Sequence, residues 1–153
     1  METARAAVAG RTLLIVEDEI LSAMSLQDAL EDAGYRVLDL TGRYQEAVQA
    51  ARADKPDLAL VNIQLHGRDD GVALAGEFKE MGIPVLFISG QAGRARSART
   101  AAVGSLPKPY SPSDMVKAVD YLLRHLAGDE TVSPPAALEV FETSVASLAP
   151  DDA

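Results

Sequence analysis

The chain has 153 residues, and 23 aspartates and glutamates against 14 lysines and arginines give it a formal charge of −9. Residues 128–153 hold six acids and no base, so the rest of the chain carries 17 acids against 14 bases. No concentrated basic face is present, which argues against nucleic-acid binding. The absence of cysteine excludes disulfides and thiolate chemistry. No apolar run approaches the ~18 residues of a membrane span, and we therefore expect a cytoplasmic protein of one domain.

Short apolar runs alternate with helical patterns along the chain. A loose arm is expected over residues 1–10 and a domain over residues 11–127. Strands are predicted at 12–19, 36–40, 57–63, 84–89 and 105–107, and helices at 21–33, 44–53, 70–81, 91–102 and from the capping residue Ser111 to Gly128. Five such alternations with short connections predict an α/β fold, a doubly wound five-stranded parallel sheet with helices on both faces.

Polar and charged side chains stand at the ends of the predicted strands. Glu17 and Asp18 end the first strand, Asn62 stands at the end of the third, Ser89 ends the fourth and Lys108 follows the fifth. Ligand sites of open parallel sheets lie beyond the carboxyl ends of the strands, so we expect these residues to meet in one shallow pocket. Carboxylate, amide and carbonyl oxygens suit Mg²⁺, while a hydroxyl and an ammonium opposite them would hold phosphoryl oxygens.

Several separated motifs carry a resemblance to a known family. They are LLIVEDE, PDLALVNIQL, the Asp70-Gly71 pair, VLFISG and LPKPY. Over residues 11–127 this set resembles the receiver domain of two-component response regulators, the CheY-like family. The resemblance implies a flavodoxin-like fold and a signalling module, not an enzyme, in which an aspartate accepts phosphate from a histidine kinase or a phosphotransfer protein.

The resemblance also implies a role for each residue of the pocket. Asp18 would ligate Mg²⁺ directly and Glu17 through water, and Gln64 would add its backbone carbonyl. Ser89 and Lys108 would contact the phosphoryl group. Glu19, the third acid of the run, is expected only to favour the positive end of the helix that follows it.

The phosphoacceptor position holds Asn62 in place of aspartate, which is the main departure from the family. An ionised carboxylate can attack phosphorus, whereas a neutral amide oxygen is a poor nucleophile. We therefore expect no phosphate on Asn62 and weaker binding of Mg²⁺. Asn62 is either native, which would make this a pseudo-receiver, or an introduced substitution, and both alternatives stay open. Asp69 and Asp70 are expected to serve the following turn and helix cap, and His66 is expected to be solvated.

A second set of residues is expected on the face through which receivers meet partners. This set is Arg94, Arg96, Arg99, Ser105 and Tyr110. Ser105 stands where the family commonly has an aromatic residue, and Tyr110 either supplies aromatic surface in its place or packs as an ordinary side chain. The arginines could dock an acidic partner or the chain's own tail, or could form a solvated face.

The acidic tail over residues 128–153 is too short for an output domain. Leu138, Phe141, Val145 and Leu148 have the spacing of one helix face. The tail is therefore expected either to form a short amphipathic helix, packed on the domain or on a second copy in a homodimer, or to be disordered.

The main hypothesis is a single-domain response regulator that acts through contacts with a kinase, a phosphotransfer protein or a downstream target. The alternative is a small α/β enzyme or ligand-binding module on a flavodoxin-like fold. Against it, the turn after the first strand is acidic and would not cradle a ligand phosphate. A third hypothesis is a scaffold that competes with another receiver for a kinase.

Overall fold

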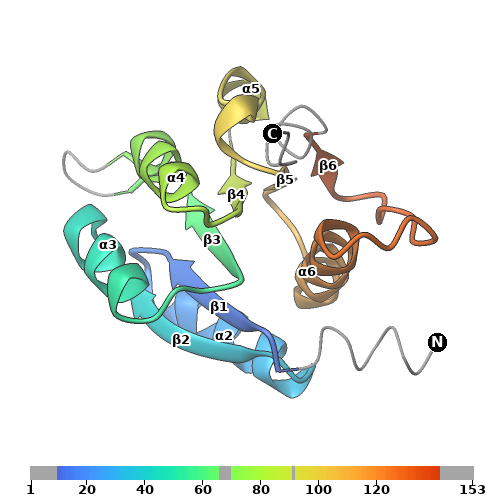
Figure 1. Ribbon diagram of the computed structural model, residues 1–153, viewed down its shortest axis with the longest axis horizontal. Helices are drawn as coiled ribbons and strands as arrows, with labels where there is room; N and C mark the ends of the chain where they lie inside the picture. The colour runs from blue at the N-terminus through green and yellow to red at the C-terminus, as the bar shows by residue number, and fades with distance from the viewer. Residues whose placement is uncertain (1–9, 66–69, 91, 142–153) are drawn as a thin grey trace.

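A six-stranded sheet lies at the centre of the computed structural model, which describes residues 10–65, 70–90 and 92–141 (Figure 1). The strand order is β2-β1-β3-β4-β5-β6. The first five strands are parallel, which confirms the predicted fold class, and the short β6 adds an antiparallel edge beyond the five predicted strands. The strands are β1 (Thr12–Val16), β2 (Arg36–Thr41), β3 (Leu58–Asn62), β4 (Val85–Ser89), β5 (Gly104–Pro107) and β6 (Glu139–Val140).

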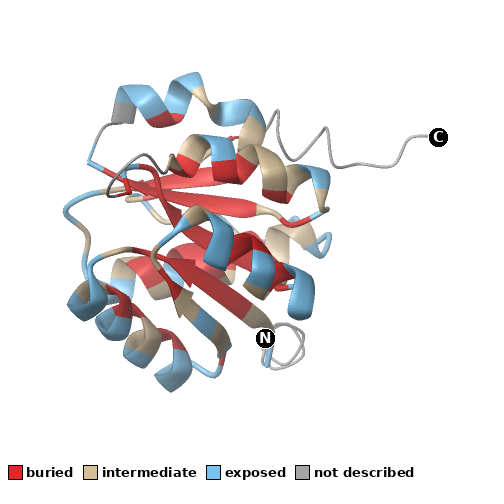
Figure 2. Ribbon diagram, turned by 90° about the vertical axis from the view of Figure 1, so that its left-hand side faces the viewer, coloured by how far each residue is buried: buried red, intermediate tan, exposed pale blue. Residues whose placement is uncertain are grey.

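Helices cover both faces of the sheet, as Figures 1 and 2 show. On one face α2 packs against α6, and on the other face α3 packs against α4, with α5 beside β4 and β5. The helices are α2 (Ile20–Asp32), α3 (Tyr44–Ala53), α4 (Gly71–Glu80), α5 (Ala92–Ser97) and α6 (Pro112–Leu126). No described helix combines the length and apolarity that crossing a bilayer requires.

The central strands are apolar on both sides, and this produces two cores (Figure 2). Successive side chains of a strand point to opposite faces. In β1, Leu13 and Ile15 therefore join the core under α2 and α6, while Leu14 and Val16 join the core under α3, α4 and α5. Both faces of a parallel sheet are covered by helices in this way, which leaves its polar chemistry at the strand ends.

Local signals set most helix ends. Ser111 accepts a hydrogen bond from the backbone N–H of Asp114, whose carboxylate accepts one from the backbone N–H of Ser111, so the predicted capping box is present. Asp70 caps α4 by accepting from the N–H of Val72 at 2.9 Å, as predicted. The weak helix predicted at 91–102 is shorter in the structure, where α5 gives way to a 3₁₀ turn (Arg99–Ala101).

The segment that follows α6 differs from its predicted form. The spacing of Leu138 and Phe141 predicts either one face of a short helix or a disordered tail, but the residues between them form β6, which pairs with β5. Both side chains are buried in the cores of the sheet. Val145 and Leu148 lie outside the described residues, as do residues 1–9 of the predicted N-terminal arm.

Candidate functional site

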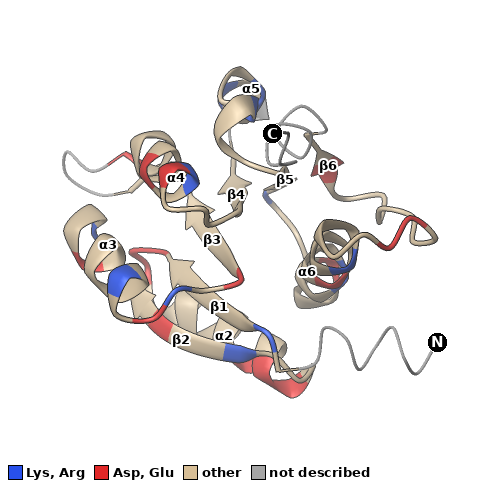
Figure 3. Ribbon diagram, in the orientation of Figure 1, with Lys and Arg blue, Asp and Glu red and all other residues tan. Residues whose placement is uncertain are grey.

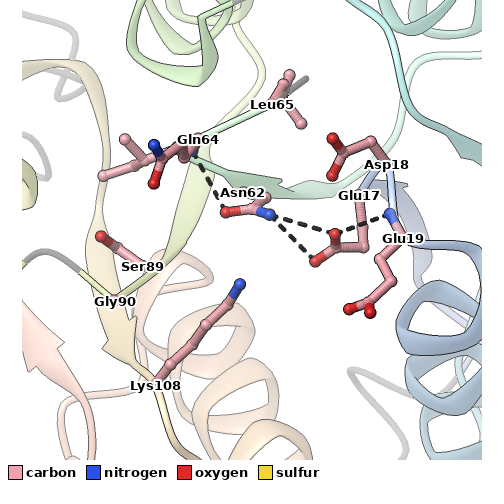
Figure 4. A pocket seen from close by; sticks show the side chains of 10 residues that line it. Glu17, Asp18, Glu19, Asn62, Gln64, Leu65, Ser89, Gly90 and Lys108 are labelled. Atoms are coloured by element: carbon pink, nitrogen blue, oxygen red, sulfur yellow. Dashed lines mark hydrogen bonds between the residues drawn. The ribbon is translucent and has the colours of Figure 1, made fainter. Parts of the chain in front are cut away.

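A polar pocket opens at the carboxyl ends of four parallel strands, as expected for this topology (Figure 4). The β1–α2 turn forms one wall, the end of β3 forms the floor, and the ends of β4 and β5 form the opposite wall. The pocket is lined by Glu17, Asp18, Glu19, Asn62, Ile63, Gln64, Leu65, Ser89, Gly90 and Lys108. The structure thus brings together all the predicted metal and phosphoryl residues.

Asn62 forms a bridge across the floor of this pocket. Its amide nitrogen donates to the two carboxylate oxygens of Glu17 at 3.3 and 3.2 Å. Its amide oxygen accepts from the backbone N–H of Gln64 at 3.3 Å. These partners define the orientation of the amide, since a carboxylate can only accept and a backbone N–H can only donate. Both residues of the bridge are 5% exposed, although 45 positions separate them in the sequence.

Glu17 is the electrostatic centre of the pocket. Burial raises the pKa of its carboxyl above the ordinary value. The backbone N–H of Glu19, the charge of Lys108 and the amide of Asn62 act in the opposite direction and favour the ionised form. The N–H of Glu19 donates to Glu17 Oε2 at 3.0 Å. Because these three groups stabilise the ionised form of Glu17, the protein can hold this carboxylate in place without a bound cation.

The opposite wall carries the other predicted residues. Figure 4 shows Lys108 extending from the end of β5 toward Asn62 and Glu17, and Ser89 on the same side of the pocket with its hydroxyl toward Gln64. The backbone N–H of Lys108 donates to the carbonyl of Ser89 at 2.8 Å, which ties the ends of β4 and β5 together. Ser89 is buried. A cation and a hydroxyl therefore face two carboxylates across the pocket.

A close backbone approach holds the floor of the pocket against α4. A Cβ atom on Gly71 would lie 2.2 Å from the carbonyl oxygen of Asn62 and 2.7 Å from the Cα of Ile63. The N–H of Gly71 donates to the carbonyl of Ile63 at 2.9 Å. Only glycine leaves room for this contact, so the Asp70-Gly71 pair combines a helix cap with a site that admits no side chain.

The donor chemistry of the pocket suits a hard cation. Glu17 and Asp18 supply carboxylates, Asn62 an amide oxygen and Gln64 a backbone carbonyl, and such oxygens are what Mg²⁺ prefers. Within the described ranges, however, no group of three or more His, Cys, Asp or Glu side chains is arranged to hold a metal. The donor atoms of these residues are thus of the type that Mg²⁺ binds, and two of the residues are carboxylates that can carry negative charge.

The residues predicted to meet partners do not form one open surface. Arg94 pairs with Asp70 at 2.8 Å, and Arg96 pairs with Glu139 of β6 at 2.9 Å. Figure 3 shows basic positions (blue) on α5 and an acidic position (red) on β6 at this edge. Ser105 is 1% exposed because β6 covers it. For Arg96, the docking of the chain's own tail is the alternative that the structure shows.

Tyr110 and the loop residues have their own surroundings. Tyr110 is half-buried against the core under α2 and α6, and burial together with the charge of Glu17 raises the pKa of its phenol to about 12. Glu19 is the first residue before α2, and its carboxylate accepts from the hydroxyl of Ser22 at 2.7 Å, so it does not bond to the helix backbone. His66 and Asp69 lie outside the described residues.

The comparison with known proteins agrees with this geometry. The family model of the response regulator receiver domain matches residues 13–120. The chain belongs to this receiver family. It is 34% identical over 114 residues to the transcriptional regulatory protein PdtaR of Mycobacterium tuberculosis, covering 72% of this chain and 55% of PdtaR. It is 30% identical over 114 residues to the phyllosphere-induced regulator PhyR of Methylorubrum extorquens, covering 72% of this chain and 43% of PhyR. The receiver chain thus spans about half the length of these relatives or less.

Solved receiver structures share the fold. The signal receiver domain of a modulated diguanylate cyclase from Desulfovibrio desulfuricans is 31% identical with a TM-score of 0.68, covering 77% of this receiver and 98% of that chain. The receiver domain of NtrX from Brucella abortus is 28% identical with a TM-score of 0.68, covering 72% and 97%. Receiver domains are signalling modules of two-component systems that bind Mg²⁺ at the acidic pocket and interact with histidine kinases or phosphotransfer proteins.

Some residues of the site were not predicted from the sequence. Ile63 and Gly90 line the pocket directly after β3 and β4, and Leu65 lines it three residues after β3. Their position just beyond the strands is the signal that could have found them. Gly42 was also missed, and a Cβ atom there would lie 3.0 Å from the Cα of Asp18. This glycine directly follows the neighbouring strand β2, so its contact with the β1 turn depends on the order of the strands in the sheet.

Proposed function

We propose that this receiver acts in two-component signalling through protein–protein contacts and does not carry phosphate at residue 62. The observation that carries the proposal is the Asn62 amide, which donates to both carboxylate oxygens of Glu17. In a receiver that accepts phosphate, the residue at this position supplies a nucleophilic carboxylate. Here the same position supplies a neutral amide, which is a poor nucleophile and is already bonded on both sides.

The amide also changes what the pocket requires of a metal. An aspartate at position 62 would place a second carboxylate against Glu17, and the pair would need a cation or a proton between them. The amide nitrogen supplies that positive partner from within the chain. Mg²⁺, when bound, would neutralise phosphoryl oxygens, and Glu17, Asp18, the Asn62 amide oxygen and the Gln64 carbonyl would hold it. We propose that these residues hold it weakly, because only two of the donors are charged.

Lys108 and Ser89 keep a structural role under this proposal. The positive charge of Lys108 offsets part of the effect of burial, which raises the pKa of Glu17, so the lysine acts as a counter-charge to the Glu17 carboxylate. Ser89 is tied to Lys108 through the backbone at 2.8 Å. The wall that would contact a phosphoryl group thus supports the Asn62–Glu17 bridge.

An apolar surface beside the pocket supports contact with a protein partner. Ile20, Leu21 and Met24 on the first turns of α2 are 60%, 76% and 48% exposed. A shallow groove next to them runs from Leu21 to Tyr110 and shares Lys108 with the pocket. Exposed apolar patches with polar surroundings are typical of protein interaction sites. We assign this surface to the kinase or phosphotransfer protein, since it lies where such a partner would meet the pocket.

Phosphate transfer is tested by intact mass. The wild-type chain is incubated with Mg²⁺ and acetyl phosphate, or with a cognate kinase and ATP, beside the Asn62→Asp variant. The proposal expects no added phosphoryl group on the wild type and one on Asn62→Asp. A phosphoryl group on the wild type, localised to residue 62 or to a neighbouring acid acting in its place, would overturn it. If Asn62→Asp also stays unmodified, the pocket has lost more than its nucleophile.

The docking surface is tested by binding to a kinase dimerisation domain. Leu21→Glu adds a charge to the apolar patch, whereas the matched control Gln49→Glu adds the same charge to an exposed position on α3. Because α3 lies on the opposite face of the sheet, the proposal expects a loss of affinity for Leu21→Glu and none for Gln49→Glu. Equal affinities of both variants would place the partner elsewhere. The affinity of the wild type should not change when acetyl phosphate is added.

A further inference from the structure

The segment after α6 returns to the sheet and covers its far edge. Residues 129–137 form a linker, and β6 then pairs antiparallel with β5, Glu139 opposite Ser105 and Val140 opposite Gly104 (Figure 1). The N–H of Phe141 continues the ladder by donating to the carbonyl of Val103 at 3.0 Å. Without this segment β5 would be an open edge strand, which is a template for pairing with another chain.

Side chains anchor the segment on both faces of the sheet. Leu138 is 7% exposed and packs in the core under α2 and α6, whereas Phe141 is 4% exposed and packs in the core under α3, α4 and α5. Arg96 holds Glu139 at 2.9 Å. The edge therefore accepts an extended segment with apolar residues at its first and fourth positions and an acid at its second.

The edge is also shaped at backbone level for this occupant. A Cβ atom on Gly104 would lie 2.9 Å from the carbonyl oxygen of Glu139 and 3.3 Å from Leu138 Cδ1. Glycine at this position lets the segment approach closely. The seat for residues 138–141 is thus a complementary surface with a defined sequence preference.

The linker, in contrast, adds only partly buried contacts, since its Val132 and Ala137 pack half-buried against the core under α2 and α6. Residues 129–137 contain no helix or strand and are exposed or half-exposed. Pro134 and Pro135 lack a backbone N–H, and Thr131 bonds only to the nearby carboxylate of Asp129 at 2.9 and 2.6 Å. A different path of the linker would therefore give up the partial contacts of Val132 and Ala137 but would keep the contacts that residues 138–141 make with the β5 edge.

We propose that residues 138–141 are exchanged between two copies of this chain, each copy seating its segment on the β5 edge of the other. The same hydrogen bonds, buried side chains and Arg96–Glu139 pair form in the exchanged dimer as within one copy, and only the linker changes course. Exchange of an identical element is a low-cost route to a dimer. The partner surface is a second copy of the chain, and the inference does not depend on the chemistry of the Asn62 pocket.

Disulfide trapping tests the exchange, because the chain has no cysteine of its own. Ser105→Cys and Glu139→Cys are made as separate full-length variants, mixed, incubated at high concentration and oxidised. Directly opposite residues of an antiparallel pair lie within disulfide range. Exchange expects a disulfide-linked heterodimer on non-reducing gels. The double variant Ser105→Cys/Glu139→Cys, diluted and oxidised, checks the geometry by forming its disulfide within one chain.

Two controls separate exchange from collision and from misfolding. Ser97→Cys places an exposed thiol on α5, so a Ser97→Cys and Glu139→Cys mixture measures random cross-linking. Exchange requires a higher yield for the buried Ser105→Cys than for Ser97→Cys, and an equal or lower yield overturns it. Light scattering gives an independent test of the oligomeric state. A wild-type dimer that is lost in Phe141→Asp but kept in Ser133→Asp supports exchange. A monomer at every concentration, or a dimer indifferent to Phe141→Asp, overturns it.

Discussion

Replacing Asn62 by aspartate would convert the bridge on the pocket floor into a repulsive pair. The amide nitrogen lies 3.2 and 3.3 Å from the two oxygens of Glu17, and an aspartate oxygen would take its place at a similar distance. Both side chains are 5% exposed, so water screens the pair poorly. The backbone N–H of Gln64 could still donate to residue 62, so the change is confined to the side facing Glu17.

The expected cost follows from the charges and the lost hydrogen bonds. Two like charges about 4 Å apart interact by about 4 kcal/mol at an effective dielectric constant of about 20. A hydrogen bond to a charged group adds about 1.5–3 kcal/mol. Lys108 offsets part of this, and the pair can take up a proton at about 1.4 kcal/mol per unit of raised pKa. We therefore expect Asn62→Asp to lower the free energy of unfolding by about 2–4 kcal/mol at neutral pH without metal.

Urea denaturation in EDTA and in excess Mg²⁺ measures this cost and its relief. Mg²⁺ should stabilise Asn62→Asp by about 2.7 kcal/mol at a hundredfold excess over its dissociation constant, and should stabilise the wild type much less. Asn62→Ala is the control, because it removes the same amide without adding charge and should be destabilised with or without Mg²⁺. If Asn62→Asp is as stable as the wild type in EDTA, the amide is not a substitute for the cation.

Three further predictions concern the pocket, its floor and the covered edge. Burial raises the pKa of Glu17 above 4.5, so the protonated carboxyl contributes stability below that pH, and this contribution is lost as the pH rises through the raised pKa. In urea titrations, the free energy of unfolding of the wild type minus that of Glu17→Gln should therefore fall with pH, and a difference that does not change with pH would contradict this. Gly71→Ala should cost about 1–3 kcal/mol in thermal unfolding because its Cβ atom would overlap the Asn62 carbonyl, whereas Gly76→Ala, which meets no atom within 4 Å, should be neutral or stabilising. Phe141→Ala should cost about 3 kcal/mol because a buried aromatic side chain is lost, and a cost no larger than that of Ser133→Ala would show that the segment is not anchored.

Much of the site follows from local sequence and one rule of topology. Alternating strands and helices place the ends of parallel strands at one edge, so Glu17, Asp18, Ser89 and Lys108 could be assigned to a common pocket before their distances were known. The capping box at Ser111 and the cap at Asp70 were equally predictable, because both depend on residues within three positions. Local chemistry of this kind does not change when the rest of the chain is added.

Contacts between residues distant in sequence depend on the tertiary structure. The sequence alone showed that Asn62 lacks a nucleophile, but not that its amide is bonded to Glu17, 45 positions away. The spacing of Leu138 and Phe141 is compatible with one helix face. In a strand, however, residues three positions apart point to opposite faces, and here the two side chains enter opposite cores. The segment forms a strand and not a helix because it can pair with the edge of β5 and bury an apolar side chain in each core. Neither the edge nor the cores can be inferred from the segment's own sequence.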